Sequence, residues 1–399
     1  MGTRGPGVVL GRSRPRGGVR VLHVMTRYLR GGSEKRLHDM VRAMPEAVHE
    51  LVAGDESSPA EAIRAIDLGS VRMVPSLVRP PSPADDARAL VAIRRIVRDV
   101  APDLVVTHQS KAGVLGRLCA AESRIPSIAS LSMANFGPGY SPWQSATFRT
   151  IERSLHRATA AYAVVGRDLA RRFERIGVPA DKLRVVRSGM QLPSPGSPAP
   201  PPDVVRRRLG IALDRQLIVY VGSLEARKNV EDLLPLLRQI RGDAGRSPVL
   251  AIAGEGPLEG NLSRSIRDDG LSDDVHLLGF LEAPLELLAA ADACILLSRA
   301  EGVPQVLVQA AALDTPFVAY DVDGVRELLA MGARGRVVGI GDLHGAARAT
   351  SEVLRWEAGQ GIPSIDLSGW SPAAIEQAYR DVIRAVLPGV GVDLPLRGV

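Results

Sequence analysis

The chain has 399 residues and a mass of 42.5 kDa, which is enough for two or three domains at roughly 100–200 residues each. Hydrophobic residues make up 45% and charged residues 24%, a balance that excludes a globally disordered chain, and the 4% of aromatic residues predicts an aliphatic core. The net charge of +6 is compatible with phosphate, nucleotide or anionic membrane partners and does not choose among them.

The N-terminal residues 1–18 are rich in glycine, arginine and proline, and we predict a disordered basic tail there. Its apolar stretch, Val8–Leu10, is shorter than a signal peptide needs. The sequence contains no run of about 18 apolar residues, so we expect no transmembrane helix. Cys119 and Cys294 lie far apart within apolar patterns, which argues against a disulfide framework and against a cysteine-based metal site. We therefore expect a cytoplasmic protein.

After the tail, short apolar runs alternate with amphipathic segments. Runs at 19–25, 103–108 and 160–166 predict buried parallel strands, and a helical pattern follows each of them. The first helix is expected to have Ser33 as its N-cap. Strands that alternate with helices predict a doubly wound sheet. We therefore assign residues 19–192 to an N-terminal Rossmann-like domain.

Prolines crowd residues 193–203, and this segment predicts a linker because proline cannot continue a helix or a central strand. The alternation restarts over residues 204–370, which we assign to a second Rossmann-like domain. Its predicted strands lie at 217–223, 249–256, 275–280, 293–298 and 316–320. The last segment, 371–388, predicts an amphipathic helix with Ser371 as its N-cap. The predicted fold class is α/β, with two doubly wound domains.

In a doubly wound sheet, ligands bind beyond the carboxyl ends of the strands, and glycines follow two of the predicted strands. Gly31 and Gly32 either bring backbone N–H groups close to an anion or form a flexible loop. Gly254 and Gly256 begin a dinucleotide-like pattern, but Glu259 stands where its third glycine belongs. This disfavours NAD binding and leaves a plain tight turn as the alternative.

Charged residues follow two further strands of the second half. Arg227 and Lys228 stand together at a helix entrance, where they suit a phosphate group or form a solvated pair. Glu301 lies just ahead of a helix in which Pro304 is expected at the first position. Its carboxylate can accept hydrogen bonds from sugar hydroxyls, or it simply interacts favourably with the positive end of the helix dipole.

These features belong to longer stretches that follow one another in a characteristic order. The stretches are GGSEKRL (31–37), THQSKAGVLGRL (107–118), VGSLEARKNVEDLL (221–234), AGEGPLEGNL (253–262), EGVPQVLVQAAALDTPFV (301–318) and DVDGVREL (321–328). In their order and spacing they resemble the family four retaining glycosyltransferases. The resemblance spans residues 19–387 and implies the GT-B fold, in which two Rossmann-like domains face a central cleft.

The resemblance implies a nucleotide-sugar donor in the second domain and an acceptor in the first, to which the terminal helix crosses back. Glu301, Lys228 and Arg227 would be the catalytic residues: the two cations would meet the donor diphosphate and the carboxylate would bind the transferred sugar. The donor-binding residues that it implies are Gly31, Gly32, Ser223, Gly254, His276, Leu278, Gly302, Val303 and Gln309. Of these, Gln309 would hold the ribose, and the main chain around His276 and Leu278 would read the base.

Three positions depart from the family pattern. The second of the family's paired glutamates is Gln309 here, and its amide can still bond to ribose hydroxyls. Ser223 replaces an arginine of the phosphate loop, a charge that Arg227 can supply instead. Ser132 stands where the family has a histidine that contacts the sugar. These departures motivate an alternative function, a GT-B partner protein that binds nucleotide sugars with weak or no catalysis.

The residues that we expect to bind the acceptor lie in the first domain and are His108, Ser132, Phe136, Tyr140 and Trp143. The three aromatic residues share one loop, where they stack on an acceptor or pack as a rigid loop. On the next predicted helix, Arg149, Arg153 and Arg157 form a basic face. This face is either a peripheral contact with the inner face of the membrane, as lipid-linked acceptors would require, or a solvated surface.

The expected function is retaining transfer of a sugar, from a UDP-sugar by preference, to a glycan, lipid-linked or natural-product acceptor. We expect no metal and no other cofactor, because Asp321 and Asp323 precede a glycine in what is interpreted as a structural turn. An epimerase of the same fold class is disfavoured, since it needs acid and base residues in the site. Dispersed basic residues without interleaved aromatic residues disfavour nucleic acid as a partner.

Overall fold

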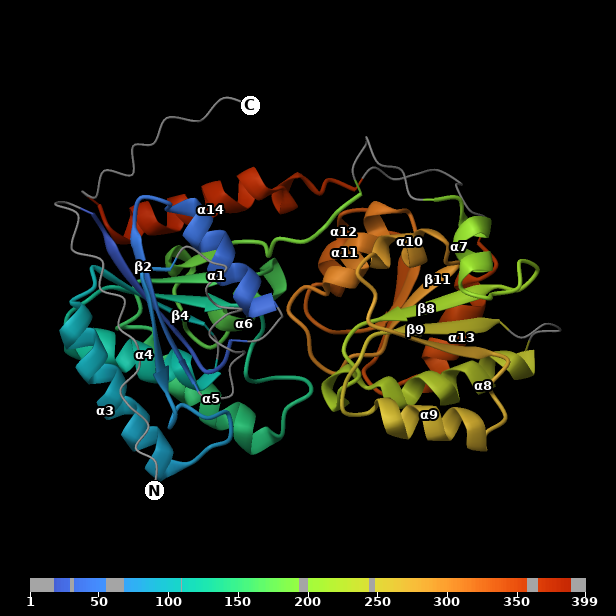
Figure 1. Cartoon of the computed structure of the whole chain (residues 1–399), viewed down its shortest axis with the longest axis horizontal. Helices are drawn as coiled ribbons and strands as arrows, with labels where there is room; N and C mark the ends of the chain where they lie inside the picture. Colours follow the sequence, from blue (N-terminus) through green and yellow to red (C-terminus); the bar gives the residue numbers. More distant parts are fainter. Residues whose placement is uncertain are drawn as a thin grey trace, which may run out of the picture. The chain divides into compact units, whose positions relative to one another are not determined.

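The computed structural model describes residues 18–28, 32–54, 68–108, 110–193, 200–243, 248–356 and 365–388 (Figure 1). The chain divides into two compact units: unit 1 is Met1–Gly189 with Ser368–Val399, and unit 2 is Met190–Leu367. Residues 1–17 of the predicted tail, Gly31, and residues 194–199 of the predicted linker lie outside the described residues.

Unit 1 is built on a seven-stranded parallel sheet with the order β3-β2-β1-β4-β5-β6-β7. Its strands are β1 (Arg20–Met25), β2 (Val48–Gly54), β3 (Ser70–Val74), β4 (Leu104–His108), β5 (Ser127–Leu131), β6 (Ala161–Val164) and β7 (Leu183–Val185). Its α-helices are α1 (Gly32–Ala43), α3 (Pro83–Val100), α4 (Ser110–Glu122), α5 (Pro142–Leu155), α6 (Arg167–Glu174) and α14 (Pro372–Val386). A helix follows each of β1, β3, β4, β5 and β6 before the next strand begins, and such crossover connections join strands that run parallel.

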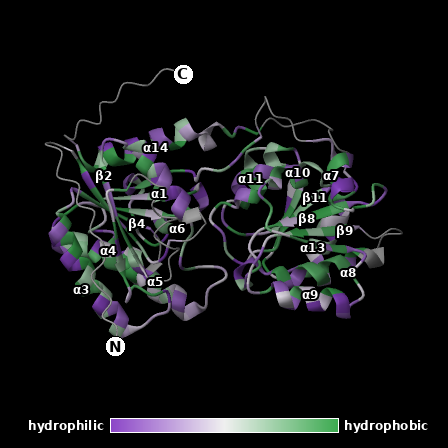
Figure 2. Cartoon of the chain, in the orientation of Figure 1, coloured by the Kyte–Doolittle hydropathy of each residue, from purple (hydrophilic) through white to green (hydrophobic). Residues whose placement is uncertain are grey.

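Helices cover both faces of this sheet with apolar side chains. Met40 of α1 and Tyr379 of α14 pack with Val21 and Val106 of the sheet on one face. On the other face, Ile93 of α3 belongs to a cluster that α4 also joins. Figure 2 shows the result, with hydrophobic strands inside and hydrophilic residues on the outer helical surfaces. The sheet therefore leaves its carboxyl edge, rather than its faces, for chemistry.

Unit 2 is built on a six-stranded parallel sheet with the order β10-β9-β8-β11-β12-β13. Its strands are β8 (Leu217–Val221), β9 (Val249–Ala253), β10 (Val275–Gly279), β11 (Ala293–Leu296), β12 (Phe317–Tyr320) and β13 (Gly335–Val338). Its α-helices are α7 (Pro202–Arg208), α8 (Leu233–Asp243), α9 (Glu259–Asp268), α10 (Pro284–Ala289), α11 (Gln305–Ala312), α12 (Val325–Ala330) and α13 (Leu343–Val353). Helices α8 and α13 pack together. The predicted α/β class with two doubly wound sheets is confirmed.

The structure adjusts several predicted boundaries. Helix α1 includes Ser33, which is therefore not its N-cap, and α7 begins at Pro202, inside the segment assigned to the linker. The prediction for the last helix is confirmed: Ser371 caps α14 by accepting a hydrogen bond from the backbone N–H of Ala374. Strands β2, β3, β5, β7 and β13 are additions to the predicted set. The unit boundary at Gly189 comes three residues before the predicted domain end.

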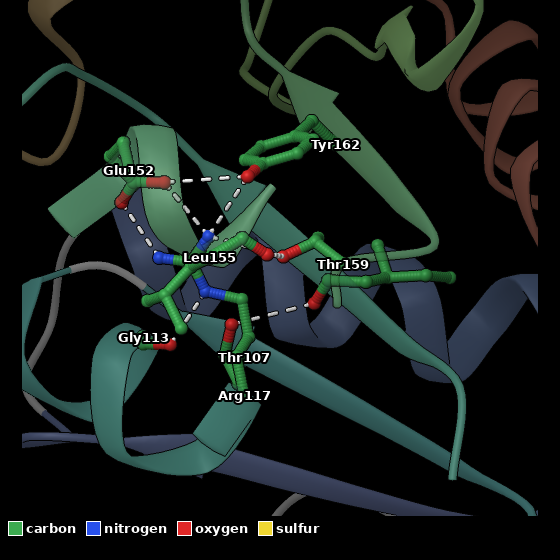
Figure 3. A network of polar contacts seen from close by, with 8 residues as sticks. Thr107, Gly113, Arg117, Glu152, Leu155, Thr159 and Tyr162 are labelled. Atoms are coloured by element: carbon green, nitrogen blue, oxygen red, sulfur yellow. Dashed lines mark hydrogen bonds and ion pairs between the residues drawn. The ribbon is translucent and has the colours of Figure 1, made fainter. Parts of the chain in front are cut away.

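A buried ion pair fixes α5 against the rest of unit 1 (Figure 3). Arg117 of α4 and Glu152 of α5 form two hydrogen bonds of 2.7 and 2.8 Å, with side chains 1% and 5% exposed. Arg117 also donates to the carbonyl of Gly113 and to the hydroxyls of Thr159 and Tyr162. Such partners compensate the desolvation of both charges. The network thereby holds the helix that follows the predicted acceptor loop.

Candidate active site

Two glycine-containing loops meet beyond the carboxyl ends of β8 and β9 in unit 2. The N–H of Gly222 donates to Ala253, and the N–H of Leu224 donates to Glu255. Gly254 has a φ of +142°, and a Cβ atom there would lie 1.9 Å from the carbonyl oxygen of Gly222. Only glycine permits that approach. The geometry at Gly254 thus fits the tight turn that the sequence analysis gave as an alternative.

An ion cluster lies beside these loops. Lys228, at the end of the 3₁₀ turn η2 (Ala226–Lys228), donates from Nζ to Glu301 Oε1 at 2.6 Å. Arg227 Nη1 lies 3.3 Å from the same oxygen. The backbone joins the two segments as well, because Arg299 N–H donates to the carbonyl of Arg227. Residues 73 positions apart in the chain are therefore brought together at adjacent strands, β8 and β11.

The Glu301 carboxyl group is ionised in this setting. Its side chain is 10% exposed and that of Lys228 is 16% exposed. Burial alone would raise the pKa of Glu301, but the charges of Lys228 and Arg227 outweigh it and hold this pKa below its usual range. Lys228 has three N–H donors and Glu301 takes one of them. The ammonium group can therefore keep Glu301 in place and still face an anion.

Arg227 occupies the place where a cation was predicted to compensate for Ser223. Its guanidinium donates to the carbonyl of Ala300 at 2.9 Å and to Glu225 Oε1 at 2.8 Å. Ser223 is exposed and donates to the same Glu225 carboxylate at 3.0 Å. Glu225 was missed by the sequence analysis, although it stands three residues before Lys228. Its carboxylate orients Arg227 toward Glu301.

The loop before α11 presents backbone donors next to Glu301. Among the described residues, no backbone carbonyl accepts from the N–H groups of Gly302 and Val303. Pro304 is the N-cap residue and α11 begins at Gln305, so the predicted first helical position is wrong by one residue. Gly324 packs closely against this loop, since a Cβ there would lie 2.7 Å from the carbonyl oxygen of Gly302. Its φ of +86° also favours glycine. Free N–H groups at a helix start favour an anion.

The other predicted donor-binding residues lie on α11 and β10 of unit 2. Gln309 of α11 is 9% exposed, and its Nε2 donates to the carbonyl of Gln191 at 2.8 Å. His276 and Leu278 belong to β10, the edge strand, whose register with β9 shifts between Leu277 and Gly279. An edge strand with such an irregularity offers backbone groups that the ladder does not use.

The predicted acceptor-binding residues lie in unit 1. His108 ends β4 at the carboxyl edge of the sheet, and Ser132 follows β5 by one residue. Trp143, in the first turn of α5, is 66% exposed. Phe136 is 3% exposed and packs on Phe173 with ring centroids 5.3 Å apart, which fits the alternative of a packed, rigid loop. Tyr140 is partly buried in the same loop.

Two further expectations bear on metals and membranes. Within the described ranges, no group of three or more histidine, cysteine, aspartate or glutamate side chains is arranged to hold a metal ion. Asp321 instead forms two 2.8 Å hydrogen bonds with Arg326. Both cysteines are buried and free. Of the helices that the structure describes, none combines the length and apolar character needed to cross a membrane.

Comparisons with known proteins agree with these features. The model of the family "Glycosyl transferases group 1" matches residues 203–358, and that of the "Glycosyl transferase 4-like domain" matches residues 31–189. The putative teichuronic acid biosynthesis glycosyltransferase TuaC of Bacillus subtilis is 27% identical over 64% of this chain and 63% of its own length. Alpha-D-kanosaminyltransferase of Streptomyces kanamyceticus is 32% identical over 34% of this chain and 35% of its own. The chain thus spans less than two thirds of the first curated relatives that it matches.

Solved structures match over nearly the full length. HepE of Anabaena, in complex with UDP, has 19% identity and a TM-score of 0.67, covering 92% of this chain and 97% of its own. WaaG, a glycosyltransferase of lipopolysaccharide biosynthesis, has 14% identity and a TM-score of 0.66 over 93% and 100%. At these identities the likeness establishes the fold. Together, the two family models and the two parallel sheets show that the chain belongs to the group 1 glycosyltransferases and has the GT-B fold.

Proposed function

We propose that the chain is a retaining, metal-independent glycosyltransferase that moves a sugar from a UDP-sugar to a sugar-containing or lipid-linked acceptor. The observation that carries this proposal is the contact of Lys228 and Arg227 with Glu301 beside the unused N–H groups of Gly302 and Val303. This contact places two cations close to the start of α11, beyond the ends of β8 and β11. That combination suits a diphosphate leaving group next to a sugar.

The chemistry follows from the charges that develop. The bond between the anomeric carbon and the β-phosphate oxygen breaks, and a bond from that carbon to the acceptor oxygen forms. Negative charge grows on the diphosphate, where Lys228 and Arg227 stabilise it. The acceptor proton passes to the departing phosphate oxygen, so no protein base is required and both bonds lie on one face of the sugar. Glu301, kept ionised by its partners, accepts hydrogen bonds from hydroxyls of the transferred sugar.

Relatives support the donor and the acceptor class. HepE is described in complex with UDP and with UDP-glucose. An Escherichia coli relative, 23% identical over 63% of this chain, is a UDP-Gal:alpha-D-GlcNAc-diphosphoundecaprenol alpha-1,3-galactosyltransferase. These names favour uridine over other bases and include a lipid-linked acceptor. The N-terminal unit then binds the acceptor and the C-terminal unit binds the donor.

Two measurements test this function. Thermal shifts with UDP, GDP, ADP and dTDP should be largest for UDP, because a ligand that binds the native state raises its stability. Release of UDP from UDP-sugars should be catalysed by the native protein and lost in Lys228→Met. Arg336→Met is a matched control, since it breaks an ion pair with Glu352 in the same unit but at β13. Equal release by Lys228→Met and the control would refute the proposal.

One observation favours the alternative, a nucleotide-sugar-binding partner protein without strong catalysis. The amide of Gln309, which replaces the family's second glutamate, is already engaged with the carbonyl of Gln191. A protein that gives a thermal shift with UDP but releases no UDP from any UDP-sugar would have this second function.

A further inference from the structure

Three buried histidines form a continuous chain of hydrogen bonds in unit 1. His49 Nε2 lies 2.9 Å from the carbonyl oxygen of Met44, and His49 Nδ1 lies 2.9 Å from His23 Nε2. His23 Nδ1 lies in turn 3.1 Å from His108 Nε2. All three residues are buried, with at most 2% of their surface exposed. We call this set of residues the histidine chain.

The register of the parallel strands explains how the three rings meet. His49 of β2 is opposite Val21 of β1, and His108 of β4 is opposite Met25 of β1. His23 lies midway between those two levels. Because side chains two residues apart share a face of a sheet, the histidines lie on one face and advance by two residues at each strand. The histidine chain therefore runs toward the carboxyl edge of the sheet and ends at His108, the last residue of β4.

The carbonyl at the lower end sets the direction of every hydrogen bond. A carbonyl oxygen only accepts, so His49 Nε2 carries the proton that it donates to Met44. In a neutral imidazole the other nitrogen is then an acceptor, so His49 Nδ1 accepts from His23 Nε2. By the same step, His23 Nδ1 accepts from His108 Nε2. His108 Nδ1 is left as a bare acceptor at the edge of the sheet.

The surroundings keep His23 and His108 neutral, as this order requires. Burial, with His49 and His108 nearby, holds the pKa of His23 well below its usual range. Burial and the charge of Arg36 on α1 lower the pKa of His108 to about 3. Arg36 is itself 1% exposed, and its guanidinium donates to Ser130, Ser188 and the carbonyls of Ala163 and Val186. A fixed cation thus stands close to His108 and disfavours its protonation.

The upper end of the histidine chain lacks a donor. In the described part of the protein, His108 Nδ1 is shielded from solvent and has no hydrogen-bond partner. Leaving a buried acceptor unsatisfied is unfavourable, so a group that donates to it gains affinity. The histidines do not conduct protons out of the site, because the far end is a backbone carbonyl that cannot take one up. Their effect is to orient one ring and fix its tautomer.

We propose that His108 Nδ1 is a preset hydrogen-bond acceptor for a hydroxyl group of the acceptor sugar, and that His23 and His49 are positioning residues which fix its tautomer. The ligand part of this inference rests on the proposed glycosyltransferase function, whereas the tautomer part stands on the geometry alone. This role also determines specificity. A bare Nδ1 favours a ligand group that donates a hydrogen bond at this point and disfavours a group that can only accept one.

The test is a long-range ¹H–¹⁵N spectrum of the full chain labelled with ¹⁵N-histidine, with His108→Asn to assign the His108 signals. We expect the Nε2–H tautomer at His23, His49 and His108 and a bare Nδ1 at His108. Titration with methyl α-D-glucopyranoside should move the His108 Nδ1 signal upfield as a hydroxyl donates to it. A protonated His108 Nδ1 in the free protein would overturn the inference, and a signal that stays in place throughout the titration would overturn its ligand part.

Two variants separate positioning from general structure. His49→Phe keeps a ring in the core but removes the hydrogen bonds to Met44 and His23, so the His108 signals should show a mixture of tautomers although His108 is two hydrogen bonds away. His38→Phe is the matched control, because His38 bonds to Tyr28 outside the histidine chain. If His49→Phe does not fold, the wild-type spectrum decides. UDP release from UDP-glucose in the same sample reports the proposed function separately, since its absence would leave the tautomer result intact.

Discussion

Replacing Lys228 by methionine tests the site most sharply, because methionine nearly keeps the volume and removes the charge and the donors. In the native protein, Lys228 Nζ lies 2.6 Å from Glu301 Oε1 and contributes a cation next to the proposed diphosphate. Removing one contact of this kind to a developing negative charge costs about 10²–10³ in kcat, or about 2.7–4 kcal/mol. We expect that loss in the rate of UDP release.

The same change has an effect on stability that can be separated from the effect on rate. Glu301 would remain buried with only Arg227, at 3.3 Å, as a cationic partner. Removing one partner of a buried polar group costs about 1–3 kcal/mol in the free energy of unfolding. Because the native contacts lower the pKa of Glu301, they stabilise the protein above the usual carboxyl range near about 4.3. This contribution is lost as the pH falls through the lowered folded-state pKa.

The assay combines steady-state UDP release with urea denaturation at pH 7 and at pH 4, with Arg336→Met as the control. We expect Lys228→Met to be less stable than the native protein at pH 7, by a margin that shrinks at pH 4. A variant that keeps native turnover, or one that is destabilised equally at both pH values, would show that the contact with Glu301 does not have the role assigned to it.

Three other changes have distinct expected outcomes. Glu301→Ala should abolish transfer whereas Ser132→Ala should have little effect, as steady-state UDP release will show; comparable losses in both would contradict the role of Glu301. Gly254→Ala should destabilise unit 2 by about 1–3 kcal/mol, because the φ of +142° and the 1.9 Å approach to Gly222 leave no room for a Cβ; an unchanged urea midpoint would refute this. Arg117→Met should cost about 3–5 kcal/mol by leaving Glu152 buried and unpaired, measured by urea denaturation, and a loss below about 1 kcal/mol would show that solvent reaches the carboxylate.

The sequence was sufficient to predict the fold class because its strands are short apolar runs at regular spacing. The strand that it describes at 293–298 is β11, and the helix with Ser371 as its cap is α14. Less regular strands escaped: β3 has only one fully buried residue, Val74, and β7 has only Leu183, so neither stands out by hydrophobicity.

The candidate site was predictable in its residue types and not in its pairings. Arg227, Lys228 and Glu301 each follow a strand, which marks them as edge residues. Their mutual contacts depend on β8 and β11 being neighbours, a crossover that the linear order does not reveal. Phe136 shows a second limit, because the sequence alone does not decide whether an aromatic residue in a loop turns inward, as it does here against Phe173.

The histidine chain could not be predicted from the sequence for a related reason. His23 lies 26 positions from His49 and 85 positions from His108 in the sequence. Only the register of β1, β2 and β4 brings their rings together. A single histidine at the end of a strand suggests a ligand contact. The fixed tautomer follows only when all three rings and the carbonyl of Met44 are seen together.

The central claim is that cationic side chains at the edge of unit 2 grip the diphosphate of the donor. Calorimetric titration of UDP and UMP into the native protein and into Lys228→Met measures this directly. We expect the native protein to prefer UDP over UMP by at least about tenfold, equivalent to about 1.4 kcal/mol, and Lys228→Met to lose most of that preference. Equal affinities for the two nucleotides in the native protein, or an undiminished preference in the variant, would contradict the account.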